Sequence, residues 1–149
     1  MTRSKRESIV LALAKEITVL EDDDIRVYRN LDKPQKIPAD GIIIIRDNDA
    51  AKEIDVLLNP VTYIFELIIQ LEVMVQHQDA NVRTKRLDEL LLRIERIINI
   101  NRTINGLAEW VELKSAEFQD EPIEGAATIR AAIIPVVVRF NDSIATVYS

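Results

Sequence analysis

The residues best suited to catalysis are one histidine and the acid and serines that could act with it. His77 is the only histidine of the chain, and Asp79 follows two residues later. A histidine oriented by a carboxylate can serve as general base for a serine nucleophile. The available serines, such as Ser115 and Ser143, are distant in the sequence and have no nucleophile-elbow motif around them. We therefore expect His77 to be a polar residue at a strand end, and the protein not to be an enzyme.

Two acidic runs have the oxygen-rich composition that hard cations prefer. They are residues 22–24 (Asp-Asp-Asp) and residues 47–49 (Asp-Asn-Asp), and the second begins like the calcium-binding loop of an EF-hand. Lys52 stands where that loop needs its glycine, and Leu58 stands where it needs its bidentate glutamate. The EF-hand reading is therefore rejected. We expect solvated acids in turns, with a surface calcium ion as the less favoured alternative, and no cofactor.

The composition excludes other kinds of site. The chain has no cysteine, which excludes disulfides, zinc–thiolate sites and cysteine nucleophiles. Gly41, Gly106 and Gly125 are isolated from one another, so no glycine-rich loop is present to hold a phosphate. The net charge of −6 argues against nucleic acid or an anionic membrane as the main partner.

The length and hydropathy pattern predict one folded domain, residues 1–149. Apolar residues make up 48% and charged residues 30% of the chain, the balance of a globular protein. Lys15 and Glu16 interrupt the apolar run that follows the basic start, so we expect no signal peptide and synthesis in a cytoplasm. No stretch is apolar for long enough to predict a membrane span.

The first half of the chain predicts one helix and several strands. Ser4 and Glu7 have the spacing of a capping box, in which each side chain accepts from the other residue's amide, and a helix is predicted over 5–19. A short strand is expected over 24–29, then a proline-containing loop over 31–40. The run Ile42–Ile45 is typical of a strand buried on both faces. A further strand is expected over 53–58.

The clearest pattern is the alternation over residues 61–76. Every odd-numbered residue in this range is apolar, whereas the even-numbered residues are mixed. A straight strand of this length would reach about 50 Å at 3.3 Å per residue. We expect it to bend, to contain a bulge or to project beyond the domain body.

The second half predicts a helix followed by further strands. The helix is expected over 82–98, capped by Asp79 or Asn81, with arginines and acids interleaved on a solvated face. Alternation then runs over 110–118, followed by a loop over 120–125 and a strand over 128–140. Pro135 marks an edge or bulge in that strand, and the tail 141–149 can add a short strand.

These elements predict an α+β fold, a mostly antiparallel β-sheet with two α-helices packed on one face. Two helices cover only one face of the sheet. Apolar residues on the other face, among them Ile64, Ile68 and Met74, then need a second partner. We hypothesise a subunit interface on that face.

The segment 101–112 resembles the RT-x-x-GL-x-x-W-V segment of a family of small minor tail proteins of long-tailed phages and prophages. The matching residues are Arg102, Thr103, Gly106, Leu107 and Trp110. The order of elements is similar over nearly the whole chain, and the family resembles tail terminators. The resemblance implies a ring, usually of six subunits, that caps the head-proximal end of the tail tube and stops its polymerisation.

The same resemblance implies partners and a location. The partners are other copies of the chain, the tail tube protein and the head–tail connector protein, while DNA passes through the ring without specific binding. The location is the virion tail, reached from the host cytoplasm.

The motif residues are expected to be structural rather than catalytic. Arg102 and Thr103 would hold the end of the second helix, and Gly106 would permit a positive φ in the turn. Leu107 and Trp110 would anchor the next strand in the core.

An acidic lumen would suit DNA passage because it repels the phosphate backbone. The candidate lumen acids are Asp22, Asp23, Asp24, Glu66 and Glu72. Two alternatives stay open. One is a small α+β ligand-binding domain or enzyme of unknown substrate, and the other is a monomeric or dimeric adaptor for a larger partner.

Overall fold

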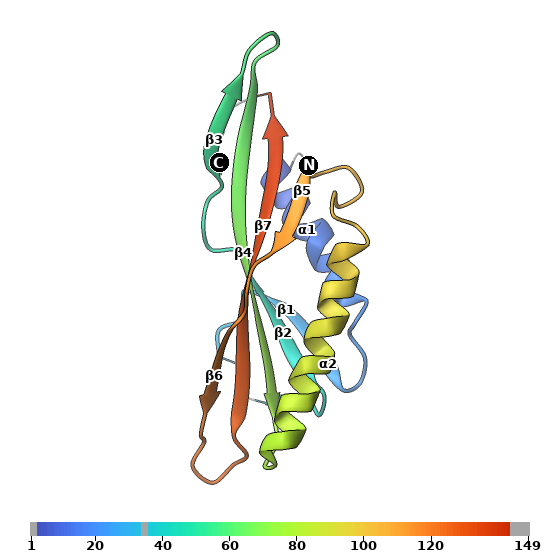
Figure 1. Cartoon of the computed structure of the whole chain (residues 1–149), viewed down its shortest axis with the longest axis vertical. Coiled ribbons are helices and arrows are strands. Elements are labelled where there is room, and N and C mark those ends of the chain that lie inside the picture. Colours follow the sequence, from blue (N-terminus) through green and yellow to red (C-terminus); the bar gives the residue numbers. More distant parts are fainter. Residues whose placement is uncertain (1–2, 34–35, 144–149) are drawn as a thin grey trace.

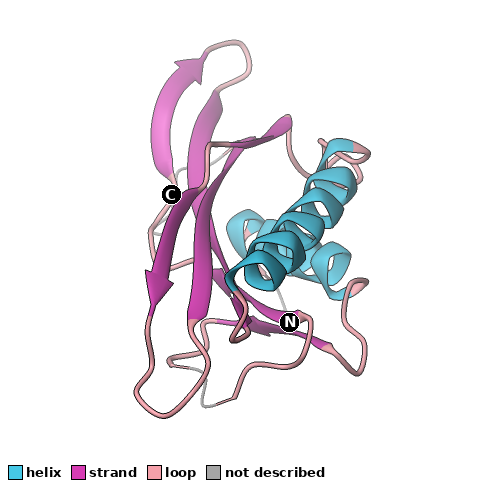
Figure 2. Ribbon diagram, turned by 60° about the horizontal axis from the view of Figure 1, so that its bottom comes forward, coloured by secondary structure: helices cyan, strands magenta, loops and turns pink. Residues whose placement is uncertain are grey.

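The computed structural model describes residues 3–33 and 36–143. Within this range, one seven-stranded sheet carries two helices on one face, which confirms the α+β fold (Figures 1 and 2). The helices are α1 (Lys5–Thr18) and α2 (Ala80–Asn99). The strands are β1 (Ile25–Arg29), β2 (Gly41–Arg46), β3 (Lys52–Leu57), β4 (Thr62–Gln76), β5 (Trp110–Leu113), β6 (Glu117–Glu121) and β7 (Ile129–Asp142).

The antiparallel pair β4–β7 is the spine of the sheet. Its register runs from Tyr63 opposite Asp142 to Gln76 opposite Ile129. The strand order is β1-β2-β4-β7-β5, while β3 adds to β4 and β6 adds to β7. All pairs are antiparallel except β1–β2, which is parallel.

The main core lies between the helices and the odd-numbered side chains of β4, as the alternation predicts. Each apolar side chain fully buried there stabilises the fold by about 1.5–3 kcal/mol. The buried residues of β4 on this face are Phe65, Leu67, Ile69, Leu71, Val73 and Val75; the helices contribute Ile9, Val10, Leu13, Ile17, Leu87, Leu90, Ile94 and Ile98.

The excess length of β4 is accommodated by projection. The end of the β3–β4 hairpin reaches beyond its neighbouring strands (Figure 1). Every residue of β3 is exposed, and the pairing of β3 with β4 shifts register between Glu53 and Asp55. We call residues 52–63 the arm.

A second, smaller core lies on the other face of the sheet. Ile42, Ile44, Met74 and Ala131 are buried there, and Leu31, Ile37 and Ile129 pack against them. The expectation that Met74 needs an outside partner is therefore wrong, because the loop after β1 covers it. Farther along β4 on the same face, Ile68 stays 41% exposed.

The alternating segment 110–118 is two strands rather than one. β5 and β6 pair with different parts of β7, and β6 includes Asp120 and Glu121, which were expected in a loop. Between them, the amide of Lys114 donates to the carbonyl of Pro135 at 2.9 Å. The backbone nitrogen and carbonyl of one strand residue point toward the same neighbouring strand. Proline has no N–H, so Pro135 cannot donate a hydrogen bond on this side, and β5 and β6 are interrupted there. Residues 141 and 142 extend β7, and the rest of the expected tail strand, 144–149, lies outside the described residues.

Gly41 begins β2 at a point where the backbone lies close to Leu90 of α2 and to Met74 of β4. Its φ is +128°, and a Cβ there would lie 2.9 Å from a methyl group of Leu90 and 3.0 Å from the carbonyl oxygen of Met74. Only glycine fits this backbone without displacing its neighbours.

Candidate assembly interface

The open face of the sheet, opposite the helices, is formed by β4, β7 and β5 at the end nearer the arm. The register places Ile68 opposite Val137, Glu66 opposite Arg139, and Trp110 on the far side of Arg139. Ile68 and Trp110 are 41% and 49% exposed. Apolar and charged side chains therefore alternate across a surface that no described helix covers.

A hollow of about 500 Å³ lies on this face, lined by Glu66, Glu109, Trp110, Glu112, Lys114, Val137 and Arg139. Its charges are largely paired with one another or with a neighbouring amide. Lys114 Nζ lies 3.1 Å from Glu112, and Arg139 lies 3.9 Å from Glu66. The Asn141 amide donates to Glu109 at 2.7 Å. The arrangement is one of mixed charges around an exposed indole, which suits a polar protein contact.

The arm carries the largest concentration of exposed apolar side chains. They are Ile54, Val56, Leu57, Leu58 and Val61, of which Leu58 is 73% exposed. β3 is also an edge strand, so its outer backbone groups face solvent rather than another described strand. An exposed apolar edge is a ready surface for pairing with another chain.

The motif turn after α2 is built largely as expected. Arg102 donates to the Asn99 side chain at 2.6 Å and to the Val111 carbonyl at 3.2 Å, so it ties the helix end to β5. The Thr103 carbonyl accepts from the amide of Ala108 at 2.9 Å. Gly106 has a φ of +86°. Arg102 therefore holds the end of α2 as expected, whereas the hydrogen bonds of Thr103 lie within the turn itself.

The outcome differs for the two hydrophobic motif residues. Leu107 packs against the main core, but Trp110 lies on the open face with the Arg102 guanidinium 4.7 Å from its ring centre. The expectation that Trp110 anchors the core is wrong, because the register of β5 gives the inward position to Val111.

Sequence reasoning missed Ile104 and Asn101 in the same turn. Ile104 is buried with a φ of +48°, a rare conformation for a β-branched residue. The Asn101 amide donates to Glu16 of α1, and burial raises the pKa of Glu16 while this hydrogen bond opposes the rise. The turn thereby joins both helices. Nothing in local periodicity predicts a contact between residues so far apart in the chain.

The candidate lumen acids do not form one group. Glu66 and Glu72 are on the open face of β4, where Glu72 lies 2.7 Å from Arg46. Residues 22–24 form the turn before the edge strand β1, two strands away from β4. Asp22 Oδ1 accepts from the amides of Asp24 and Ile25, so it shapes that turn.

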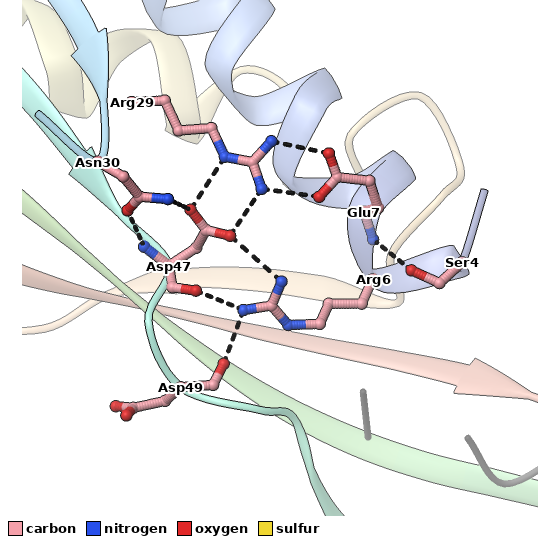
Figure 3. Close-up of polar contacts among 7 residues, drawn as sticks. All are labelled: Ser4, Arg6, Glu7, Arg29, Asn30, Asp47 and Asp49. Atoms are coloured by element: carbon pink, nitrogen blue, oxygen red, sulfur yellow. Dashed lines mark hydrogen bonds and ion pairs between the residues drawn. The ribbon is translucent and has the colours of Figure 1, made fainter. Parts of the chain in front are cut away.

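The expectation that the acids of residues 47–49 are solvated is wrong for Asp47, which is only 7% exposed. Its carboxylate lies among the side chains of Arg6, Arg29 and Asn30 (Figure 3). Arg29 donates to both of its carboxylate oxygens, at 3.0 and 2.7 Å, and Asn30 donates at 2.8 Å. Arg6 lies 3.2 Å from the same carboxylate. These contacts fasten α1 and β1 to the end of β2.

Glu7 belongs to the same cluster. Ser4 caps α1 by accepting from the amide of Glu7 at 3.0 Å, but the Glu7 carboxylate pairs with both terminal nitrogens of Arg29 instead of returning to Ser4. The capping box is thus half formed. Hydrogen bonding to Glu7, and then to Asp47, raises the pKa of Arg29 further above its ordinary value.

Both carboxylates of the cluster favour their ionised form. Hydrogen bonds from Arg29 lower the pKa of Glu7, against a smaller effect of burial. Burial raises the pKa of Asp47, but hydrogen bonds from Arg29 and Asn30, with the nearby positive charge, outweigh it and leave the pKa lowered.

In the catalytic alternative, the serines lie in other parts of the fold than His77 and Asp79. The amide of Asp79 donates to His77 Nδ1 at 2.9 Å, and the Asp79 carboxylate caps α2 by accepting from Asn81 and Val82. Ser143 follows the end of β7 and therefore lies at the opposite end of the β4–β7 ladder from His77. Ser115 lies between β5 and β6. The histidine and its acid are engaged in capping.

The described residues, 3–33 and 36–143, contain no group of three or more histidine, aspartate or glutamate side chains placed to hold a metal ion. None of the helices described is long and apolar enough to cross a membrane. No protein-family model matches the chain, and no curated protein matches it.

Proposed function

We propose that the chain is a structural subunit of a phage tail, a tail terminator that acts as a homo-oligomeric ring, with six as the copy number that the resemblance implies. The observation that carries the proposal is the apolar surface of the arm and of the open face beside it, which the described part of the chain leaves uncovered. In the proposed ring, neighbouring copies cover this surface.

Ring assembly accounts for this surface in physical terms. An edge strand with exposed apolar side chains promotes open-ended association unless something covers it. A closed ring gives every copy the same neighbours and leaves no free edge. The paired charges around Trp110 would form the polar rim of such a contact.

The ring would cap the head-proximal end of the tail tube, stop tube polymerisation and present a docking surface to the head–tail connector. DNA would pass through its centre. Glu66 and Glu72 contribute little net charge to the open face because each lies near an arginine, 3.9 and 2.7 Å away. If acids line the channel, residues 22–24 are the better candidates, since all three are exposed.

The test of the function is an assembly assay with tail-tube subunits encoded by the same genome. Added protein is expected to limit tube length, with electron microscopy of negatively stained samples showing a ring at one end only. Tubes of unchanged length, with no protein at either end, would overturn the proposal. Val19→Ser, which alters an exposed residue at the end of α1, is a matched control and should still limit length.

The hollow beside Trp110 favours one second candidate, a ligand-binding domain. Trp110 is the only tryptophan of the chain, so its emission reports directly on that hollow. Quenching by a small molecule at dilutions where the protein is monomeric would support this alternative. Emission that changes only with protein concentration would favour assembly.

A further inference from the structure

A second hollow, which we call the end pocket, lies at the opposite end of β4 from the arm. It has a volume of about 670 Å³ and is lined by Lys33, Lys36, Ile37, Gln76, Ile123, Ala126 and Ile129. Gln76 donates to the Ala127 carbonyl at 2.8 Å, and the amide of His77 donates to the Thr128 carbonyl at 3.2 Å. These bonds fix one wall of the pocket, the connection between β6 and β7, against the end of β4.

The end pocket and the arm are complementary in chemistry. Among the described residues, the pocket lining is apolar apart from Gln76 and two lysines and includes no carboxylate, in a chain whose net charge is −6. The arm has an apolar tip, and next to it the exposed acids Glu53 and Asp55, with Lys52 at its base. Burying leucine side chains of the arm in the pocket would bring its acids toward Lys33 and Lys36. Opposite charges beside an apolar contact fix its register and exclude wrong partners.

The arm of the same chain is too far away to fill the pocket. The pocket includes Gln76 at one end of β4, whereas the arm includes Thr62 at the other end. Fourteen residue steps at 3.3 Å place them about 45 Å apart. The β4–β7 ladder holds this separation fixed. An arm that occupies the pocket must therefore belong to another copy.

We propose that the arm of one copy docks into the end pocket of the next copy, as the contact that closes the ring. This inference rests on the proposed function. Arm and pocket are different surfaces, so each contact leaves one free arm and one free pocket for further copies. A head-to-tail contact of this kind gives a closed ring when the rotation between copies closes.

The cysteine-free sequence allows a direct test by cross-linking. Leu58→Cys on the arm and Ala126→Cys at the pocket, combined in one chain and oxidised, are expected to give a ladder of disulfide-linked multimers that reductant removes. A mixture of the two single variants should give dimers only. Leu58→Cys combined with Val19→Cys is the matched control, since Val19 is exposed, as Ala126 is, but is not part of the pocket, and it should give no ladder.

Charge reversal supplies a second measurement that does not depend on oxidation. Asp55→Lys places a cation near Lys33 and Lys36, and is expected to weaken self-association at least about tenfold. Adding Lys36→Glu in the same chain should restore most of the loss. Because Asp55 and Lys36 are both exposed, circular dichroism should show an unchanged fold.

The outcomes separate this inference from the proposed function. Rings that form without an arm–pocket disulfide, and that charge reversal leaves intact, would overturn the contact and keep the tail terminator. A double-cysteine chain that stops at dimers would overturn the head-to-tail arrangement. A ladder of multimers from a protein that leaves tube length unchanged would keep the contact and overturn the terminator. No cross-link at any protein concentration would overturn the contact.

Discussion

The two faces of β4 differ although one strand forms both. On the face under the helices, every odd-numbered residue from Phe65 to Val75 is buried, whereas on the open face Met74 is the only residue of β4 that is buried. The helices cover the first face, and the loop after β1 covers part of the second. The apolar surface under the helices stabilises the single chain. We propose that the exposed apolar surface of the open face joins copies.

Shortening two adjacent side chains of β4 tests the difference between its two faces. Leu67 is fully buried and Ile68 is 41% exposed. Leu67→Ala is expected to lower the free energy of unfolding by about 2–5 kcal/mol because it leaves a cavity, and Ile68→Ala by less than about 1 kcal/mol. Urea denaturation measures both. Equal losses would show that the open face contributes to folding as much as the covered face does.

The buried cluster around Asp47 gives the next largest effect. Asp47→Asn removes a charge that Arg6 and Arg29 share, and is expected to cost about 2–4 kcal/mol, less than for a fully enclosed pair because Arg29 is partly exposed. Asp49→Asn is the matched control, because Asp49 accepts from Arg6 through its backbone carbonyl and not its carboxylate. Similar costs for the two substitutions would contradict the role given to the Asp47 carboxylate.

The same cluster predicts an acid-sensitive contribution to stability. The pKa values of Glu7 and Asp47 are lowered in the folded state. Their contribution is therefore fully present above the ordinary carboxyl pKa values, near pH 4, and is lost as the pH falls through the folded-state values. Asp47→Asn should make the loss shallower when unfolding is followed between about pH 5 and 2. An unchanged pH profile would contradict this.

A smaller effect distinguishes two glycines with positive φ. Gly41→Ala is expected to cost about 1–3 kcal/mol, because the new methyl group meets Leu90 and the Met74 carbonyl. Gly106→Ala has no atom within 4 Å of the new methyl group, so only backbone strain of about 1 kcal/mol remains. Thermal unfolding compares them. A larger loss of stability for Gly106→Ala would show that backbone strain in the turn after α2 outweighs close packing at the start of β2.

The smallest effect on folding is expected for Trp110→Ala. The exposed stack with Arg102 is worth about 0.5–1 kcal/mol. Its effect on assembly should be larger, since Trp110 lies on the open face that we propose neighbours cover. Analytical ultracentrifugation and chemical denaturation, run on the same variant, compare the two. Loss of stability with unchanged assembly would assign Trp110 to folding alone.

Much of the fold could be predicted from the sequence because periodicity reports local burial. The alternation of residues 61–76 and the run Ile42–Ile45 predict buried strands, and Ser4 is predicted as a helix cap. For the second helix the sequence offers Asp79 or Asn81 as the cap, and the structure has Asp79. The pattern over 110–118 was misleading, because a break opposite Pro135 leaves no trace in alternation.

The candidate interface was predicted less well, because it depends on contacts between distant segments. The covering of Met74 by the loop after β1 and the burial of Asp47 among Arg6, Arg29 and Asn30 arise only from tertiary packing. The outward position of Trp110 follows from the register of β5 on β7, which no local pattern fixes. The exposed arm was anticipated only as excess strand length.

The most direct test of the central claim is the mass of the protein by light scattering over a wide range of concentrations, with the emission of Trp110 recorded on the same samples. We predict a single ring-sized species, six copies by resemblance, that dissociates on dilution as the Trp110 emission shifts to longer wavelength. A mass of one chain at every concentration, unchanged when tail-tube subunits are added, would contradict the proposed ring.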